Sequence, residues 1–314
     1  MKHFLRLTDL SKDELYEIID LAIDVKKKPI SNRMGGKTLG LLFEKPSTRT
    51  RVSFEAGFYQ MGGNCVVITP QTSQISRGET IEDTAKVLSR YLDMIAIRTF
   101  DHERIEQFAG NASIPVINAL TNLTHPCQLL ADMMTVVEKK GRRFDSMKIA
   151  YFGDGNNMAN TWIEAASIFG FHLSVATPQD FAPNAAILHQ AITYSGNKNN
   201  IEITDNPREA AKDADLLYTD VWNSMNQKES NEKIINLKNY QVNQELAELA
   251  KPDFLFMHCL PAHVGQEVSE SVYRSKHSVI YQEAENRLHT QKALMLKLIE
   301  LNLQEDFGVL YEKD

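Results

Sequence analysis

Three hydroxyl side chains and two arginines are interleaved in the stretch Ser47-Thr48-Arg49-Thr50-Arg51. An apolar run of strand character (39–43) precedes it, and apolar residues at helical spacing follow from Val52. The stretch is therefore expected to form the first turn of a helix at the carboxyl end of a strand. Free backbone N–H groups, the positive end of the helix dipole, hydroxyls and a guanidinium would there face one point, as a phosphate requires.

A second interpretation of this stretch is a helix with hydroxyl caps, whose arginines pair with surface carboxylates. A single Ser-Thr pair would fit that interpretation, but three hydroxyls interleaved with two arginines favour an anion site. Arg49 is the predicted phosphate ligand. Arg51 lies two residues further into the helix and is predicted to form a structural ion pair.

Two further polar residues in the first half of the chain lie at the ends of predicted elements. Arg98 lies near the end of a buried strand (93–99), and His125 opens a helix that has Pro126 in its first turn. The dipole at a helix N-terminus disfavours a protonated imidazole, so His125 is a candidate neutral hydrogen-bond donor. The alternative for His125 is a local helix cap.

The second half of the chain begins with a glycine-containing turn (153–158) that resembles half of a dinucleotide-binding fingerprint. Met158 occupies the third glycine position, and no acidic residue ends the following strand (173–177), so nicotinamide-nucleotide binding is disfavoured. The turn still presents Asn157 at a strand end, where its amide can bind a polar small molecule. Asp220 lies at the end of a later strand (216–221) and precedes a polar loop.

Cys259 lies near the end of a predicted strand (254–260), in the motif His-Cys-Leu-Pro. A free cysteine is either inert core or a reactive thiol. A zinc site is an alternative, but the spacings match no familiar ligand pattern, so no metal is predicted. The residues available for such a site are His258, Cys259, His263, His125 and Cys127.

Strands that alternate with helices along the chain predict an α/β fold with two doubly wound parallel sheets, in which ligands bind at the carboxyl ends of the strands. A charged stretch (139–143) is the predicted domain boundary, giving domains 1–140 and 141–287. A last strand is expected at 278–281. A helix from about Leu288 to Leu303 is expected to cross back, so that 288–314 joins the first domain.

The composition of the 314 residues, 43% hydrophobic and 24% charged, is that of an ordinary soluble globular protein. A net charge of −7 argues against a general nucleic-acid binder, which needs an excess of Lys and Arg. Neither a signal peptide nor a membrane-spanning apolar run is predicted. Three cysteines without a CxxC spacing fit a reducing compartment, so a cytoplasmic protein is expected.

Four motifs in order resemble those of the carbamoyltransferases, and within them the ornithine-specific family, over essentially the whole chain. The S-T-R-T motif at 47–50 and the H-P-x-Q motif at 125–128 are shared with the aspartate-specific enzymes. The H-C-L-P motif at 258–261 and the D-x-x-x-S-M motif at 220–225 point to ornithine. The resemblance implies transfer of the carbamoyl group of carbamoyl phosphate to the side-chain amine of L-ornithine, giving L-citrulline and phosphate.

The resemblance also implies a place in arginine metabolism, no metal or redox cofactor, and a homotrimer or an assembly of trimers. The positions that match phosphate ligands are Ser47, Thr48, Arg49, Thr50 and Arg98, with Gln74 on a loop that reaches a neighbouring subunit's site. The positions that match contacts to the carbamoyl group are His125, Gln128 and Arg287. Those that match ornithine ligands are Asn157, Asp220, Ser224 and Met225, with Cys259 and the Leu260 carbonyl beside the amine and the carbamoyl carbon.

These implied roles agree with the chemistry of the reaction. Arg49, Arg98 and the helix N-terminus would stabilise the departing phosphate, and His125 with Arg287 would stabilise the charge on the carbonyl oxygen. Asp220 with Cys259 would orient the amine.

One residue departs from the family pattern, because Asn226 stands where Gly usually follows Ser-Met. Asparagine tolerates left-handed conformations, so the loop can keep its shape. A related diamine such as putrescine is the nearest alternative acceptor, although it lacks the α-amino and α-carboxylate groups. A non-catalytic carbamoyl-phosphate-binding homologue is the other alternative, and it predicts the loss of some polar site residues.

Overall fold

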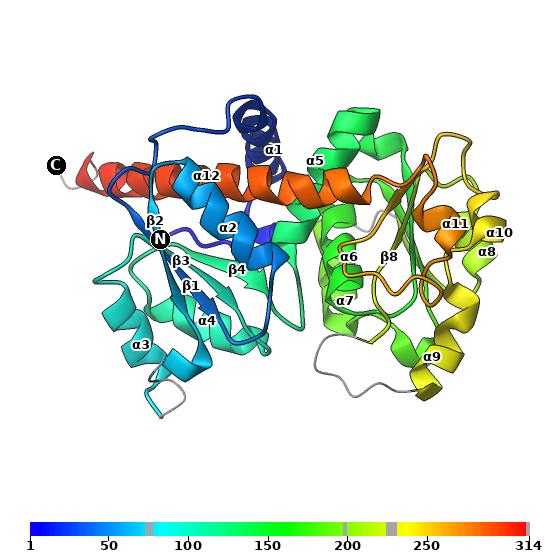
Figure 1. The fold of residues 1–314 in the computed structure, drawn as a ribbon, viewed down its shortest axis with the longest axis horizontal. Coiled ribbons are helices and arrows are strands. Elements are labelled where there is room, and N and C mark those ends of the chain that lie inside the picture. Colours follow the sequence, from blue (N-terminus) through cyan, green and yellow to red (C-terminus); the bar gives the residue numbers. More distant parts are fainter. Residues whose placement is uncertain (73, 75–77, 197–199, 224–230, 312–314) are drawn as a thin grey trace. The chain divides into compact units, whose positions relative to one another are not determined.

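The computed structural model describes residues 1–72, 74, 78–196, 200–223 and 231–311, with side chains for all of them except residues 72 and 304–311 (Figure 1). The chain divides into two compact units. The first unit comprises residues 1–134 and 285–314, and the second comprises residues 135–284. The limits at 134 and 284 lie inside helices, whereas the sequence pattern placed them at 140 and 287.

The first unit contains a four-stranded parallel sheet in the order β2-β1-β3-β4. Its strands are β1 (Thr38–Phe43), β2 (Asn64–Ile68), β3 (Met94–Arg98) and β4 (Val116–Leu120). The strand order reverses between β1 and β3, whose last residues, Phe43 and Arg98, are paired in register. Polar residues that follow β1 and β3 therefore lie at a topological switch point, where doubly wound folds bind ligands.

Helices complete the first unit, and a capping box at Ser11–Glu14 begins the first of them. The helices of this unit are α1 (Lys12–Lys27), α2 (Arg49–Gln60), α3 (Ile81–Leu88), α4 (His102–Asn111), α5 (Pro126–Lys140) and α12 (Ile280–Tyr311), of which α5 and α12 extend into the second unit. Short 3-10 helices lie at Leu7–Asp9 and Pro70–Thr72. The parallel sheet and its helices confirm the predicted fold class.

The C-terminal helix joins the first unit, as predicted, but it begins earlier than the sequence pattern indicated. The strand expected at 278–281 is reduced to a single bridge between Ser278 and Phe256, and α12 begins at Ile280. Lysine side chains are among the groups that attach α12 to the rest of the first unit. Lys26 Nζ donates to Asn286 at 2.7 Å, and Lys292 Nζ donates to the Gln60 side chain at 2.9 Å. Arg287 therefore lies within a helix, not in a loop before one.

Helix α2 forms where predicted, but the apolar residues that indicated it do not form its buried face. Phe54 and Phe58 are buried, whereas Val52 is 54% exposed and Tyr59 is 51% exposed. The buried face of α2 is therefore rotated about the helix axis relative to the face on which the sequence places Val52 and Tyr59.

The second unit contains a five-stranded parallel sheet in the order β7-β6-β5-β8-β9. Its strands are β5 (Lys148–Phe152), β6 (His172–Ala176), β7 (Ile201–Thr204), β8 (Leu216–Thr219) and β9 (Leu255–Met257). Its other helices are α6 (Asn157–Phe169), α7 (Ala185–Tyr194), α8 (Pro207–Ala211), α9 (Asn231–Leu237), α10 (Gln244–Ala247) and α11 (Glu270–Tyr273), with 3-10 helices at Phe144–Ser146, Gln179–Phe181 and Lys238–Tyr240. The strand order reverses between β5 and β8, which makes their carboxyl ends the expected ligand-binding edge.

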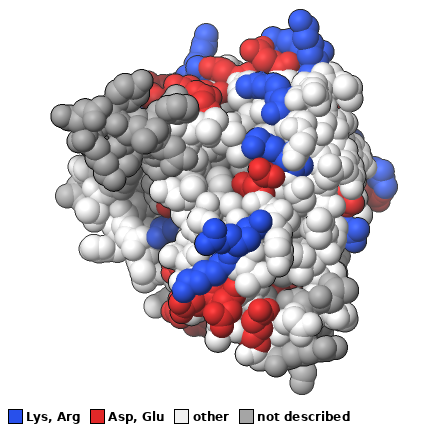
Figure 2. Space-filling view, turned by 90° about the vertical axis from the view of Figure 1, so that its left-hand side faces the viewer, with Lys and Arg blue, Asp and Glu red and all other residues white. Residues whose placement is uncertain are grey.

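Two further properties concern the charge on one face and the hydropathy of the helices. On the face shown in Figure 2, basic and acidic side chains are interleaved among the described atoms, without the continuous basic surface that nucleic-acid backbone binding needs. None of the helices in the described ranges is long and apolar enough to cross a membrane.

Candidate active site

The first unit holds a set of cationic and hydroxyl groups at the N-terminus of α2. Thr48 immediately precedes this helix and Arg49 is its first residue; both are exposed, and Ser47 is half-buried. The first-turn N–H groups of an α-helix have no acceptor within the helix, so this end provides donors for an anion. Arg51 forms the predicted ion pair, with its Nε 3.2 Å from Glu55 Oε2.

Thr50 brings two arginines from distant parts of the chain together. Its hydroxyl, on a residue only 3% exposed, accepts from Arg98 Nη1 at 3.4 Å and from Arg287 Nη2 at 3.3 Å. Two guanidinium groups that converge on one hydroxyl repel each other, and an anion bound between them would relieve that repulsion. The arrangement is that of a site for a phosphate or carboxylate.

Gln128 fixes the direction of the Arg287 guanidinium. Its Oε1 accepts from Arg287 Nη1, and its Nε2 donates to Asp132 Oδ1 at 2.8 Å. The two bonds determine which end of the Gln128 amide faces Arg287. Asp132 was not singled out from the sequence, although its i+4 spacing from Gln128 on a helix was a usable signal.

His125 is buried beside these arginines at the start of α5. Burial, reinforced by Arg287 and then Arg98, holds the pKa of His125 well below its usual value of 6.5. A neutral imidazole at this position agrees with the prediction. The sequence argument attributed it to the helix dipole, whereas the structure shows burial and two neighbouring positive charges as its causes.

Lys45 is a further buried cation at this edge of the sheet that sequence reasoning did not single out. Its Nζ donates to Asn122 Oδ1 and lies 4.2 Å from the centre of the Phe100 ring. Burial and then the charge of Arg98 lower the pKa of Lys45 to about 8. Its position directly before Pro46 was the available signal.

Gln74 is not joined to this cluster by any hydrogen bond of the described residues. Its side chain is exposed, and its backbone carbonyl accepts the N–H of Glu79 at 3.2 Å. Its predicted contact to a neighbouring subunit's site stays a prediction.

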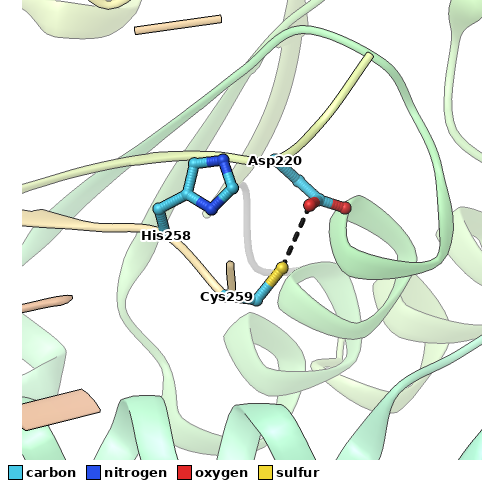
Figure 3. A group of neighbouring side chains, drawn as sticks. All are labelled: Asp220, His258 and Cys259. Carbon is cyan, nitrogen blue, oxygen red and sulfur yellow. Dashed lines mark hydrogen bonds between the residues drawn. The ribbon is translucent and has the colours of Figure 1, made fainter. Parts of the chain in front are cut away.

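The second unit brings Asp220 and Cys259 together (Figure 3). Cys259 Sγ donates to Asp220 Oδ1 at 3.0 Å, and the backbone N–H of Val221 donates to the same oxygen at 2.8 Å. The other oxygen, Oδ2, accepts from Asn156 Nδ2 at 2.8 Å. A buried carboxylate held by three donors keeps a fixed direction, from which it can bind a cationic or hydrogen-bonding amine.

Asn156, which the sequence analysis did not single out, contacts Asp220, whereas the role of the predicted Asn157 stays a prediction. The Asn156 side chain caps α6, because its Oδ1 accepts the backbone N–H of Met158. The same Oδ1 accepts from the Tyr151 hydroxyl at 3.1 Å. These bonds leave its Nδ2 directed at Asp220. An asparagine before a helix was the available signal for a cap. Asn157 begins α6 and is half-buried. Ser224 and Met225, like Asn226, lie outside the described residues.

A metal site is the alternative use of Asp220, His258 and Cys259, whose possible ligand atoms all lie within 4.8 Å of one another. The two ring nitrogens of His258 are already engaged, Nδ1 with the Leu260 N–H at 2.9 Å and Nε2 with Glu267 at 3.1 Å. A metal would have to displace one of these bonds, so the donor set does not fit one as it stands.

Cys127, the other cysteine considered for a zinc site, is not available as a thiolate. In the first unit, burial raises the pKa of Cys127 to about 12, and its Sγ donates to the Asn118 carbonyl at 3.3 Å. A metal-binding cysteine is a thiolate, whereas this thiol is held protonated.

The first unit holds a cationic cluster that suits an anion and the second holds a carboxylate–thiol pair, and these groups are consistent with the class of enzymes that transfer a group from an anionic donor. Residues 2–138 match the sequence family described as aspartate/ornithine carbamoyltransferase, carbamoyl-P binding domain. Residues 145–298 match the corresponding Asp/Orn binding domain. The chain belongs to the aspartate/ornithine carbamoyltransferase family.

Individual relatives cover nearly the whole chain. The ornithine carbamoyltransferase of Anoxybacillus flavithermus is 49% identical over 304 residues, which are 95% of this chain and 96% of that protein. That of Nitrosococcus oceani is 50% identical over 302 residues, covering 95% of this chain and 97% of the relative.

Solved structures give the same result. The ornithine carbamoyltransferase from Pyrococcus furiosus superposes with a TM-score of 0.89 at 44% identity, covering 94% of this chain and 96% of that one. The anabolic enzyme from Campylobacter jejuni has a TM-score of 0.91 at 38% identity, covering 96% of this chain and 100% of that chain. The resemblance predicted from the four motifs is confirmed.

Proposed function

We propose that the chain is an ornithine carbamoyltransferase, which converts carbamoyl phosphate and L-ornithine to L-citrulline and phosphate. The observation that carries the proposal is the convergence of Arg98 and Arg287 on the Thr50 hydroxyl at the N-terminus of α2. Identity of about half of all residues with enzymes named for ornithine supports the choice of acceptor.

The groups of the first unit suit the donor. Arg49, Arg98 and the α2 N-terminus would bind the phosphate, together with the hydroxyls of Ser47, Thr48 and Thr50. As the bond between the carbamoyl carbon and the phosphate oxygen breaks, these groups would stabilise the charge on the leaving phosphate.

The carbamoyl group is the part of the donor that His125, Gln128 and Arg287 would hold. A neutral His125 can donate to the carbonyl oxygen, whose negative charge grows during attack, and Arg287 carries a fixed positive charge. Gln128 holds the Arg287 guanidinium through its Oε1, so the donor groups are oriented before substrate arrives.

The groups of the second unit suit the acceptor. The side-chain amine of ornithine must lose a proton before its nitrogen attacks the carbamoyl carbon. Asp220 and Cys259, together with the Leu260 carbonyl, would hold the amino groups of ornithine. Asn157, Ser224 and Met225 would bind the end of ornithine that carries the α-amino and α-carboxylate groups. The fixed direction of the Asp220 carboxylate supports this role.

A steady-state assay with carbamoyl phosphate and a set of amines tests the proposal. Ornithine, putrescine and aspartate are supplied at matched concentrations, and each carbamoylated product is measured. We expect citrulline from ornithine to predominate, because putrescine lacks the α-amino and α-carboxylate groups. A predominant product from putrescine would identify the alternative transferase, and binding of carbamoyl phosphate without product would identify a non-catalytic homologue.

We also propose that the chain forms a homotrimer with sites at the subunit interfaces, and that it acts in the cytoplasm. Exposed apolar side chains support self-association: besides Val52 and Tyr59 on α2, Val66 on the edge strand β2 is 46% exposed. Three free cysteines support a reducing compartment. Light scattering that showed an active monomer would contradict both the trimer and the role of Gln74 in a neighbouring subunit's site.

A further inference from the structure

The side chain of His258, at the end of β9, is completely buried, and the contacts of its ring assign one tautomer. The backbone N–H of Leu260 donates to Nδ1 at 2.9 Å, and Nε2 lies 3.1 Å from Glu267 Oε1. A ring nitrogen that accepts from an N–H carries no proton. The neutral ring therefore holds its proton on Nε2 and donates it to Glu267.

Glu267 holds both ends of the segment 258–263. It is buried as completely as His258, and the oxygen that accepts from the His258 ring also accepts from the backbone N–H of His263. The segment forms neither helix nor strand between β9 and the bridge at Val264. Its shape therefore depends on side-chain bonds of this kind, and not on a regular backbone ladder.

Leu260 is the residue of this segment that most needs such support. Its φ is +58°, in the left-handed region that residues with a side chain rarely adopt. A residue keeps such a conformation only where its surroundings hold it, and the bond from its N–H to His258 Nδ1 is such a restraint. The same peptide unit joins Leu260 to Cys259, whose thiol donates to Asp220.

We propose that Glu267, acting through the ring of His258, is a positioning residue for the Cys259–Leu260 segment and thereby for the acceptor amine. This inference rests on the proposed function, because the segment matters through the amine that it holds. Glu283 has a different task, since it accepts the backbone N–H of His258 at 2.9 Å.

Kinetics of three variants test the proposal. Glu267→Leu removes the acceptor for both ends of the segment, Glu267→Gln keeps an oxygen of the same shape, and Glu270→Gln changes an exposed carboxylate on α11 as a control. Each variant is first checked for fold by circular dichroism and for carbamoyl phosphate binding by calorimetry.

We expect Glu267→Leu to lower kcat about 100-fold and to raise the KM for ornithine, because loss of positioning by about 1 Å has effects of this size. Carbamoyl phosphate should bind with unchanged Kd, Glu267→Gln should recover most of the activity, and Glu270→Gln should match the wild type. A role in folding alone would reduce the amount of active enzyme without changing KM. Wild-type kcat and KM in a folded Glu267→Leu variant would overturn the proposal.

A second measurement tests the contact between Glu267 and His258 and does not depend on whether Glu267→Leu folds. In the wild-type chain labelled with ¹⁵N-histidine, and with His258→Asn used for assignment, NMR should show His258 with a protonated Nε2 and an unprotonated Nδ1. A protonated Nδ1 would overturn the proposal. Absence of citrulline from the wild-type reaction would instead refute the proposed function, and the tautomer would still decide whether the Glu267 contact exists as described.

Discussion

At the scale of single residues, the site in the first unit is defined by which groups share a partner. Thr50 Oγ1 receives both Arg98 and Arg287, whereas Arg51, in the same helical turn, pairs with Glu55. Both neighbouring arginines of the motif are exposed, but only Arg51 is given an ion pair here, and Arg49 is the one that the proposed phosphate would engage.

Alanine substitution of the two flanking arginines separates these tasks. Arg49→Ala should lower kcat about 100- to 1,000-fold, because a preorganised donor to a developing anion is lost. Arg51→Ala removes an exposed i,i+4 ion pair and should leave kcat within a factor of two, with a stability change of about 0.5 kcal/mol or less. Citrulline formation and urea unfolding of both variants provide the check. Near-wild-type turnover of Arg49→Ala would contradict its assignment to phosphate.

At the scale of elements, the residues of the candidate site lie at the ends of helices and strands. Asn156 is an example, since its Oδ1 caps α6 and its Nδ2 donates to Asp220. One side chain thus connects the start of a helix to the group proposed to bind the acceptor. A residue at 156 that only capped the helix would not donate to Asp220 Oδ2, and the donors described for Asp220 would then all bind Oδ1.

Asn156→Ser divides the two contributions of this side chain. Serine is about as good an N-cap as asparagine, so the change of cap should alter the free energy of unfolding by less than about 0.5 kcal/mol. The donor to Asp220 is lost, so the KM for ornithine should rise about tenfold or more. Asn184→Ser, at the cap of α7, is the matched control and should change neither value. Equal ornithine KM values for the two variants would show that the Asn156–Asp220 bond does not contribute to binding.

The sequence predicted most elements because strand-like runs followed by turn residues are local signals. It missed β7 (Ile201–Thr204), whose short run alternates with Glu202 and lies at the sheet edge, where burial is incomplete. It placed a strand at 278–281, where an apolar run in fact begins a helix, since short apolar runs do not distinguish the two.

Motifs named several residues of the candidate site, and residues that join it only through tertiary packing were missed. Arg98, His125, Asp220 and Cys259 stand in motifs or at strand ends. Asp132, Asn156 and Glu267 act through other side chains, so their roles depend on contacts between segments that no local pattern encodes. The burial that sets the pKa of His125 is likewise a tertiary property.

At the scale of the molecule, buried histidines should make stability depend on pH. Burial and then the charge of Arg6 lower the pKa of His102 to about 4, and burial lowers that of His125 as well. Both groups bind protons more readily in the unfolded chain, so the stability that they contribute above pH 6.5 is lost as the pH falls below that value. For His102 this loss extends down to about pH 4.

Acid unfolding of His102→Gln measures this contribution. Between pH 7 and pH 5, His102 alone should remove about 2 kcal/mol from the free energy of unfolding of the wild type. Glutamine does not titrate, so the variant should lose correspondingly less over this range. Urea unfolding at the two pH values gives the comparison, and parallel losses in the two proteins would rule out His102 as a source of acid sensitivity.

The first unit is built from two separated stretches of chain, and this has a consequence for synthesis. Arg287 lies on α12, so a ribosome adds it only after the whole of the second unit. Domains generally begin to fold in the order in which they emerge. A nascent chain that ends before α12 therefore presents Thr50 and Arg98 without their second guanidinium, and the anion site is completed only when translation has passed the second unit.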